Sequence, residues 1–156
     1  MVRSFTDAVT KWTTDVPITS ETVFHVASIS KQFTAAAFLL LVQDGKLSLD
    51  DDVHKYINEL PDFDSPITIR HIIHHTSGLR DQWALPGLAG WRYSLDLITD
   101  DDVMELMTRR KELNFKPGEK DVYCNTGYTL LAQIVKRVSG NSSGNSPPAA
   151  SLSPLV

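Results

Sequence analysis

The sequence is short of several features, and each shortage excludes a class of protein. Cys124 is the only cysteine among 156 residues, so no disulfide can form within the chain, and a lone thiol fits a reducing compartment or indifference to redox state. The longest purely apolar run, Ala35–Val42, has eight residues, whereas a membrane span needs about 20. Lys and Arg number 15 against 19 Asp and Glu, for a formal net charge of −4. We therefore expect no membrane span and, because no basic face is visible, no nucleic-acid partner.

Both ends of the chain are poor in the patterns that specify a fold. Residues 1–16 lack periodicity and lack the apolar stretch of a secretory signal, so we expect an irregular N-terminal remnant there. No charged or aromatic residue follows Arg137, and residues 141–156 are rich in Ser and Pro, which predicts a disordered low-complexity tail. The predicted folded domain is residues 17–140. With no visible signal the cytoplasm is the default compartment, and the sequence leaves both the compartment and the oligomeric state open.

Start and stop signals predict the helices of this domain. A helix is expected from Ser28 to Asp44, capped by Gly45, and because it is apolar on nearly every side we expect it to be the most buried one. Residues 22–26 are β-branched and aromatic, which favours a short extended segment. Further helices are expected from Ser48 to about Ile57, from Thr68 to Ser77, from Thr99 to Lys111, and from Asn125 or Thr126 to Gly140.

The stretch Ser28-Ile29-Ser30-Lys31 has a spacing that suits nucleophilic catalysis. Residues three apart lie on one face of a helix, so the Lys31 ammonium can reach the Ser28 hydroxyl. Backbone amides at a helix N-terminus favour the negative charge that develops on an attacked carbonyl oxygen. A lysine in apolar surroundings also loses its charge readily and can act as a base. The non-catalytic alternative is that Ser28 only caps a helix.

A second pair of residues strengthens the catalytic interpretation. Tyr123 and Asn125 are two apart at a predicted junction between a loop and a helix, where both side chains can point into one cleft. A phenol can relay a proton to a leaving group, and an amide can orient a substrate carbonyl or the lysine.

Ser28-x-x-Lys31 and Tyr123-x-Asn125 together resemble the first two active-site motifs of the serine β-lactamase and penicillin-binding-protein superfamily, especially class C β-lactamases, D-alanyl-D-alanine carboxypeptidases and related carboxylesterases. The resemblance runs from about Pro17 to Gly140. It implies an α+β fold of the β-lactamase/transpeptidase type, of which this chain is mostly the helical part with much of the β-sheet missing. Other segments similar to this family, in the same order, are 17–19, 22–24, 44–51, 67–70, 75–79 and 117–118.

The resemblance also implies a reaction. Ser28 would attack the carbonyl of a β-lactam, a D-Ala-D-Ala peptide or an ester, and water would hydrolyse the resulting acyl-enzyme. Lys31 and Tyr123 would share the proton transfers, and Asn125 would bind the substrate. The implied partner is a small-molecule or peptide substrate, and no cofactor or metal is implied.

The third motif of this family, Lys-Thr-Gly or His-x-Gly on a strand beside the site, does not occur in the sequence. That strand supplies an oxyanion-hole amide, and losing such a donor costs about 100- to 1000-fold in rate. Without the sheet, one face of Ala35–Val42 would also be bare. The alternative function is therefore a catalytically silent truncated remnant or binding module, which keeps the pocket without turnover.

Other residues offer different interpretations. His71, His74 and His75 have a spacing that could suit zinc, although no acidic or Cys ligand accompanies them, so a structural role is the better interpretation. Cys124 could be a nucleophile, but between Tyr123 and Asn125 we expect it to point into the packing. Ser30 is a rival nucleophile, but we expect it to face away from Lys31. The acidic run Asp50, Asp51 and Asp52 is expected to form a solvated helix start. Three aromatic residues fit a substrate entrance and a loop anchor equally: Trp83, Trp91 and Tyr93.

Overall fold

The computed structural model describes residues 17–84, 87, 90 and 98–140. The chain divides into two units, Met1–Ser30 and Lys31–Val156, and each is described by itself. In the first unit, irregular chain leads to a one-turn 3-10 helix, η1 (Ala27–Ile29). Residues 22–26 form no strand, because β-branched residues become a strand only against a pairing partner. The predictions for residues 1–16 and 141–156, and for Trp91 and Tyr93, lie outside the described residues.

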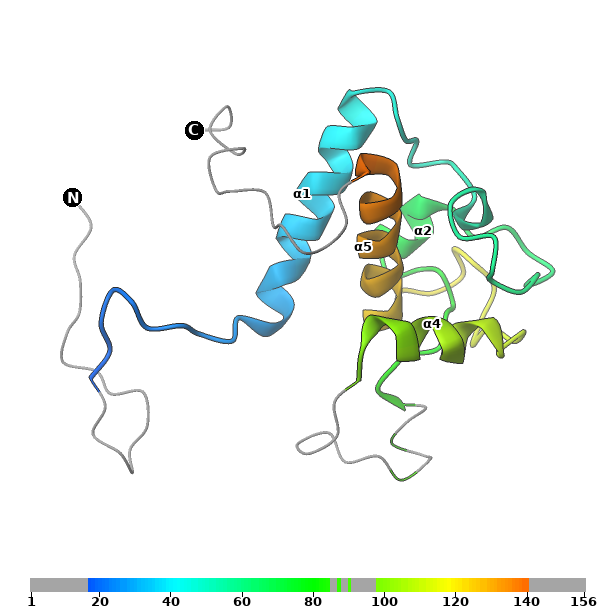
Figure 1. Cartoon of the computed structure of the whole chain (residues 1–156). Coiled ribbons are helices and arrows are strands. Elements are labelled where there is room, and N and C mark those ends of the chain that lie inside the picture. Colours follow the sequence, from blue (N-terminus) through cyan, green and yellow to red (C-terminus); the bar gives the residue numbers. More distant parts are fainter. Residues whose placement is uncertain (1–16, 85–86, 88–89, 91–97, 141–156) are drawn as a thin grey trace. The chain divides into compact units, whose positions relative to one another are not determined.

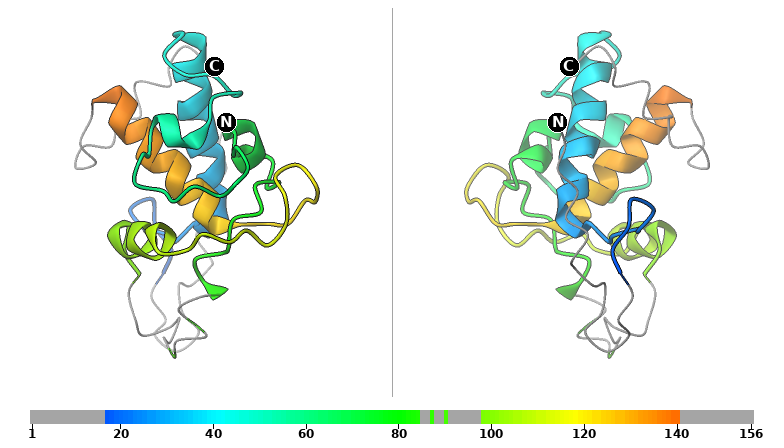
Figure 2. Two further views of the ribbon diagram at one scale, coloured as in Figure 1. Left: turned by 90° about the vertical axis from the view of Figure 1, so that its right-hand side faces the viewer. Right: turned by 90° about the vertical axis from the view of Figure 1, so that its left-hand side faces the viewer.

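The second unit is built around its last helix. Figure 1 shows α2 and α4 packed against α5, and Figure 2 shows from two further sides that α4 crosses α5 near the end where α5 begins. The buried side chains at this centre are Ile69 and Ile72 of α2, Val103 and Met107 of α4, and Leu130, Leu131 and Ile134 of α5. The elements among the described residues that follow η1 are α1 (Ser30–Gln43), η2 (Val53–Lys55), α2 (Ile69–Ile73), α4 (Asp100–Thr108) and α5 (Asn125–Ser139).

Four predicted helix ends are confirmed by local hydrogen bonds or backbone angles. After α1, Gly45 has φ +70°, and the Lys46 N–H donates to the Leu41 carbonyl at 3.0 Å, so the orphan carbonyls of the last turn are satisfied. Thr68 and Thr99 accept N–H bonds as the N-caps of α2 and α4, each within a capping box. Gly140 ends α5 in the left-handed conformation.

The predicted helix from Ser48 to Ile57 is wrong, since only η2 forms there. Asp52 forms an isolated antiparallel bridge with Thr68, and the Val53 N–H donates to the Ile67 carbonyl at 2.8 Å. These hydrogen bonds between two distant segments use the backbone groups that a helix would need. No described segment forms a strand longer than such a bridge.

The expectation that the first long helix would be the most buried is also wrong. Of its side chains only Phe38 and Leu41 are buried, whereas Phe33 is 57% and Leu39 51% exposed. Among the described residues, α5 contributes more buried side chains than α1, including Leu130, Leu131 and Ile134. The helix also begins at Ser30 rather than Ser28, because Ala27–Ile29 form the tighter 3-10 turn.

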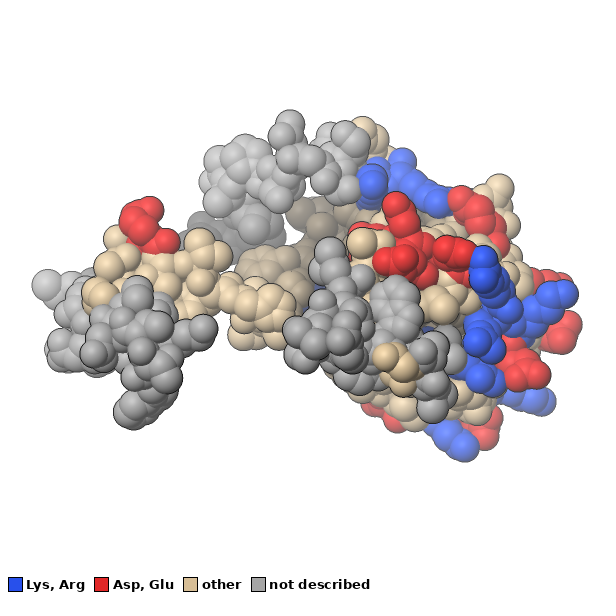
Figure 3. Space-filling model, turned by 60° about the horizontal axis from the view of Figure 1, so that its bottom comes forward, with Lys and Arg blue, Asp and Glu red and all other residues tan. Residues whose placement is uncertain are grey.

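Two surface properties follow from the described residues. None of the helices there is both long and apolar enough to cross a bilayer. On the face of the second unit shown in Figure 3, Lys and Arg side chains are interspersed with Asp and Glu rather than gathered by sign. Ion pairs in this unit include Arg70 with Asp50 at 2.9 Å and Arg137 with Glu59 at 2.8 Å.

Candidate active site

The second unit brings together three of the four predicted site residues. The Lys31 ammonium, in the first turn of α1, donates a hydrogen bond of 2.8 Å to Oδ1 of Asn125, a residue 94 positions further along the chain. The same Nζ atom lies 4.9 Å from the ring centre of Tyr123 and 5.7 Å from that of Tyr128. Ring faces attract a cation, so both tyrosines stabilise the ammonium in this position. Lys31, Tyr123 and Asn125 thus form one cluster.

The orientation of the Asn125 amide is fixed by a residue that sequence analysis did not single out. Oδ2 of Asp81 accepts from the Asn125 backbone N–H at 2.6 Å and from its Nδ2 at 3.0 Å. The Asp81 carboxylate thus lies at the NH₂ end of the amide, and Oδ1 of Asn125 faces Lys31. Asp81 precedes an aromatic loop and matches no motif, so only the fold shows that it reaches the start of α5.

The ring of His75 packs against the ring of Tyr123. Its ring centre lies 4.6 Å from that of Tyr123 and 5.3 Å from that of Tyr128. Nδ1 accepts the Cys124 N–H at 3.2 Å, which places the proton of the neutral ring on Nε2. Burial, assisted by the nearby Lys31 charge, lowers the pKa of His75 although Asp121 opposes the shift. His75 is therefore a neutral packing partner near pH 7, and it holds the backbone just before Asn125.

The side chain of Tyr123 itself is open to solvent, with 51% of the residue exposed. The segment before it is tied down by backbone bonds, because the Val122 N–H donates to the His75 carbonyl at 3.0 Å and the Gly118 N–H to the Thr76 carbonyl at 2.8 Å. A phenol that is exposed on an anchored backbone can meet a ligand without rearrangement.

Ser28 lies in the first unit, in the middle of η1. The residue before it, Ala27, has φ +47°, a left-handed conformation that costs an alanine about 1–2 kcal/mol. Strain of this kind is often retained where a side chain must be presented in a particular direction. The neighbouring Ser30 uses its hydroxyl to donate to the Ala27 carbonyl at 2.7 Å, which makes it a local structural serine.

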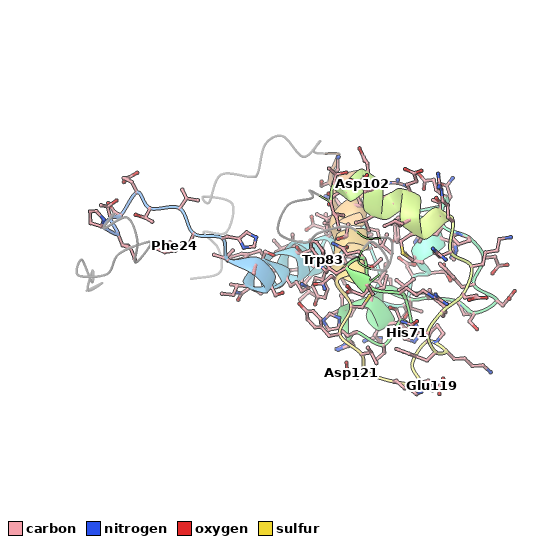
Figure 4. All side chains as sticks on the ribbon, turned by 90° about the horizontal axis from the view of Figure 1, so that it is seen from below. Phe24, His71, Trp83, Asp102, Glu119 and Asp121 are labelled. Atoms are coloured by element: carbon pink, nitrogen blue, oxygen red, sulfur yellow. The ribbon has the colours of Figure 1, made fainter. Side chains whose placement is uncertain are left out.

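Cys124 and His71, considered above as a nucleophile and as a zinc ligand, both have structural roles. Cys124 is buried, burial raises the pKa of its thiol, and its Sγ donates to the Leu79 carbonyl at 3.4 Å, so the expected packing role is confirmed. His71 accepts the Thr68 N–H at 3.2 Å and completes the cap of α2. Figure 4 shows His71 on the same side of this unit as Glu119 and Asp121, yet no group of three potential ligands in the described part of the chain could hold a metal ion.

Comparisons with known proteins show the family of this chain. A family model described as Beta-lactamase matches residues 6–146. A penicillin-binding protein of Bacillus subtilis (strain 168) is 38% identical over 128 residues, which is 81% of this chain and 27% of that protein. A D-aminopeptidase of Brucella anthropi is 33% identical over 129 residues, 83% of this chain and 24% of that protein. This chain thus spans about a quarter of the length of these relatives.

Solved structures show the same fold. An octameric penicillin-binding protein homologue from Pyrococcus abyssi aligns with a TM-score of 0.67 and 37% identity, over 82% of this chain and 30% of that one. A class C β-lactamase mutant aligns with a TM-score of 0.63 and 29% identity, over 81% of this chain and 32% of that one. The predicted α+β fold of the β-lactamase/transpeptidase type is confirmed, with this chain as a mostly helical part of it. This chain belongs to the serine β-lactamase and penicillin-binding-protein superfamily.

Proposed function

We propose that this chain carries the nucleophile and the proton-transfer groups of a serine hydrolase that works through an acyl-enzyme. The observation that supports this most is the 2.8 Å bond from Lys31 to Asn125 beside the Tyr123 ring. Lys31 of the first motif thus lies beside Tyr123 and Asn125 of the second, and the family resemblance implies a catalytic role for all three. Ser28 stands three residues before Lys31 and is proposed as the nucleophile.

In the proposed reaction the Ser28 oxygen forms a bond to the substrate carbonyl carbon, and the bond from that carbon to the leaving nitrogen or oxygen breaks. The proton of the Ser28 hydroxyl passes through Lys31 and Tyr123 to the leaving group. Water then attacks the acyl ester, and its proton returns to the Ser28 oxygen. Each transfer is of the general acid–base kind, which contributes about 10²–10⁴-fold in rate.

Asn125 has a defined part in this scheme. Its Oδ1 accepts from Lys31, and one Nδ2–H donates to Asp81. The second Nδ2–H is the group proposed to meet a substrate oxygen, since a primary amide carries two donors. The proposed substrate is an amide, lactam or ester carbonyl, and the similarity to a D-aminopeptidase supports an amide at a D-amino acid as one case.

Turnover of three substrates tests the proposal: a chromogenic cephalosporin, a short-chain p-nitrophenyl ester and a D-alanine p-nitroanilide. Wild type is compared with Lys31→Ala and with Lys46→Ala, a matched control whose exposed ammonium pairs with Asp44 away from the cluster. We expect Lys31→Ala to reduce turnover of any accepted substrate by at least about 100-fold, and Lys46→Ala to leave it unchanged. Turnover that persists in Lys31→Ala would contradict the mechanism, and no turnover by wild type would favour the catalytically silent alternative.

A further inference from the structure

We infer that Asp81 is the positioning residue of this site: it orients the Asn125 amide so that Oδ1 holds the Lys31 ammonium. The inference rests on the proposed function for its catalytic consequence, but the orientation itself can be measured without turnover. It starts from the three hydrogen bonds that one carboxylate makes. Oδ2 accepts twice from Asn125, at 2.6 and 3.0 Å, and Oδ1 accepts from the Trp83 N–H at 2.9 Å.

The bond to the Trp83 N–H closes a local turn, which fixes the direction of the Asp81 side chain. The backbone on either side is fixed by α5 as well. Thr126 donates to the Arg80 carbonyl at 2.8 Å, and Thr129 donates to the Gln82 side chain at 2.8 Å. Asp81 is thus held in register with the first turns of α5, with its carboxylate at the backbone N–H of the first residue.

An asparagine amide has two ends of nearly equal size and opposite hydrogen-bonding character. If it turned over, its NH₂ group would face the Lys31 ammonium, donor against donor, and Lys31 would lose its 2.8 Å bond. Asp81 prevents this, because the same rotation would also point Oδ1 at a carboxylate oxygen. The negative charge in addition suits the start of α5, where the capping position, Cys124, makes no side-chain hydrogen bond.

Three variants separate this role from simple support of the fold. In Asp81→Ser the hydroxyl can keep the turn at Trp83 but is too short to reach Asn125. In Asp81→Asn the side-chain oxygen can still accept both bonds from Asn125, but its NH₂ group then faces the Trp83 N–H, so the orienting bonds are kept while the charge and the turn bond are lost. Thr126→Val removes the bond to the Arg80 carbonyl, which loosens the same segment while the Asp81 carboxylate stays intact.

Two measurements are made on each variant. The first is the acetylation rate of Lys31 relative to Lys46, followed by peptide mass spectrometry under a limiting acylating reagent. The second is the rate of modification by a fluorophosphonate, resolved into a binding constant and a first-order rate constant. We expect Asp81→Ser to raise the relative acetylation of Lys31 and to lower the first-order rate constant, each by about 10-fold. Asp81→Asn and Thr126→Val should stay within about threefold of wild type.

The outcomes are distinguishable from failure of the proposed function. If wild type is never modified by the fluorophosphonate, the proposed function fails, and the acetylation of Lys31 alone decides the orientation. Unchanged acetylation in Asp81→Ser would overturn the inference. Equal effects in Asp81→Ser and Asp81→Asn would also overturn it, because the bonds to Asn125 that only Asp81→Asn keeps would then not be what matters.

Discussion

Gly78 lies in the loop between α2 and the segment leading to the site, and its replacement by alanine tests the packing of that loop. Its φ is +75°, and a Cβ atom there would lie 2.1 Å from the carbonyl oxygen of Phe115. Gly45 provides a matched control, since it has φ +70° and nothing within 4 Å of the added atom. Both substitutions place an alanine in the left-handed region, but only Gly78→Ala also creates a collision with backbone.

The magnitudes follow from these two terms. The left-handed conformation costs an alanine about 1–2 kcal/mol at either position. At Gly78 the Phe115 backbone must also retreat by about 1 Å, and overpacking of this kind costs about 1–3 kcal/mol more. We therefore expect Gly45→Ala to lower the free energy of unfolding by about 1–2 kcal/mol and Gly78→Ala by about 2–5 kcal/mol. The Asn114 N–H, which donates to the Gly78 carbonyl at 2.8 Å, should lose its protection against hydrogen exchange.

Urea denaturation of both variants and wild type, followed by circular dichroism, gives the two free energies under the same conditions. The difference between the variants isolates the collision, because the backbone strain is common to both. Equal destabilisation by Gly45→Ala and Gly78→Ala would refute the close approach of Phe115 to this loop.

Three further predictions concern other parts of the second unit. Thr99→Ala removes the cap of α4 and should lower the free energy of unfolding by about 1 kcal/mol in urea denaturation, and no change would contradict the capping box. Ile134→Ala, at a fully buried position of α5, should cost about 2–5 kcal/mol by the same assay, and a cost below about 1 kcal/mol would mean that α5 is not the centre of the core. Burial alone would lower the pKa of His54, but the Pro61 carbonyl and the Asp52 carboxylate outweigh it and raise that pKa above its ordinary value of 6.5. The stability that this provides is complete below pH 6.5 and is lost as the pH rises through the raised value, so His54→Gln should shift the urea midpoint more at pH 5.5 than at pH 8.5; equal shifts would contradict this.

Local signals in the sequence located several of the helix ends, although α2 ends at Ile73 and not at the predicted Ser77. A threonine before an apolar periodic stretch, as at Thr68 and Thr99, and a glycine after one, as at Gly45 and Gly140, act through bonds within a few residues. Such bonds can be read from neighbouring letters alone. The helix expected from Ser48 failed for the opposite reason, since distant backbone groups took up the bonds that it needed.

The site residues also separate into those that the sequence predicts and those that depend on distant contacts. Lys31, Tyr123 and Asn125 were predicted from their spacing and from the family resemblance, and the structure brings these three together. Asp81 and the stacking role of His75 were not predicted, because both depend on contacts across more than forty residues. An Asp or a His in the sequence does not by itself indicate such a contact. The contacts become visible only when α5 is seen packed against the loop after α2.

The central claim, that Ser28 is an activated nucleophile, is tested most directly by intact mass. Wild type, Ser28→Ala and Ser30→Ala are incubated with a penicillin and, separately, with a fluorophosphonate, and the position of any adduct is mapped. We expect a single adduct on Ser28 in wild type and in Ser30→Ala, and none in Ser28→Ala, since the Ser30 hydroxyl donates to the Ala27 carbonyl. An adduct that persists in Ser28→Ala, or the absence of any adduct in wild type, would contradict it.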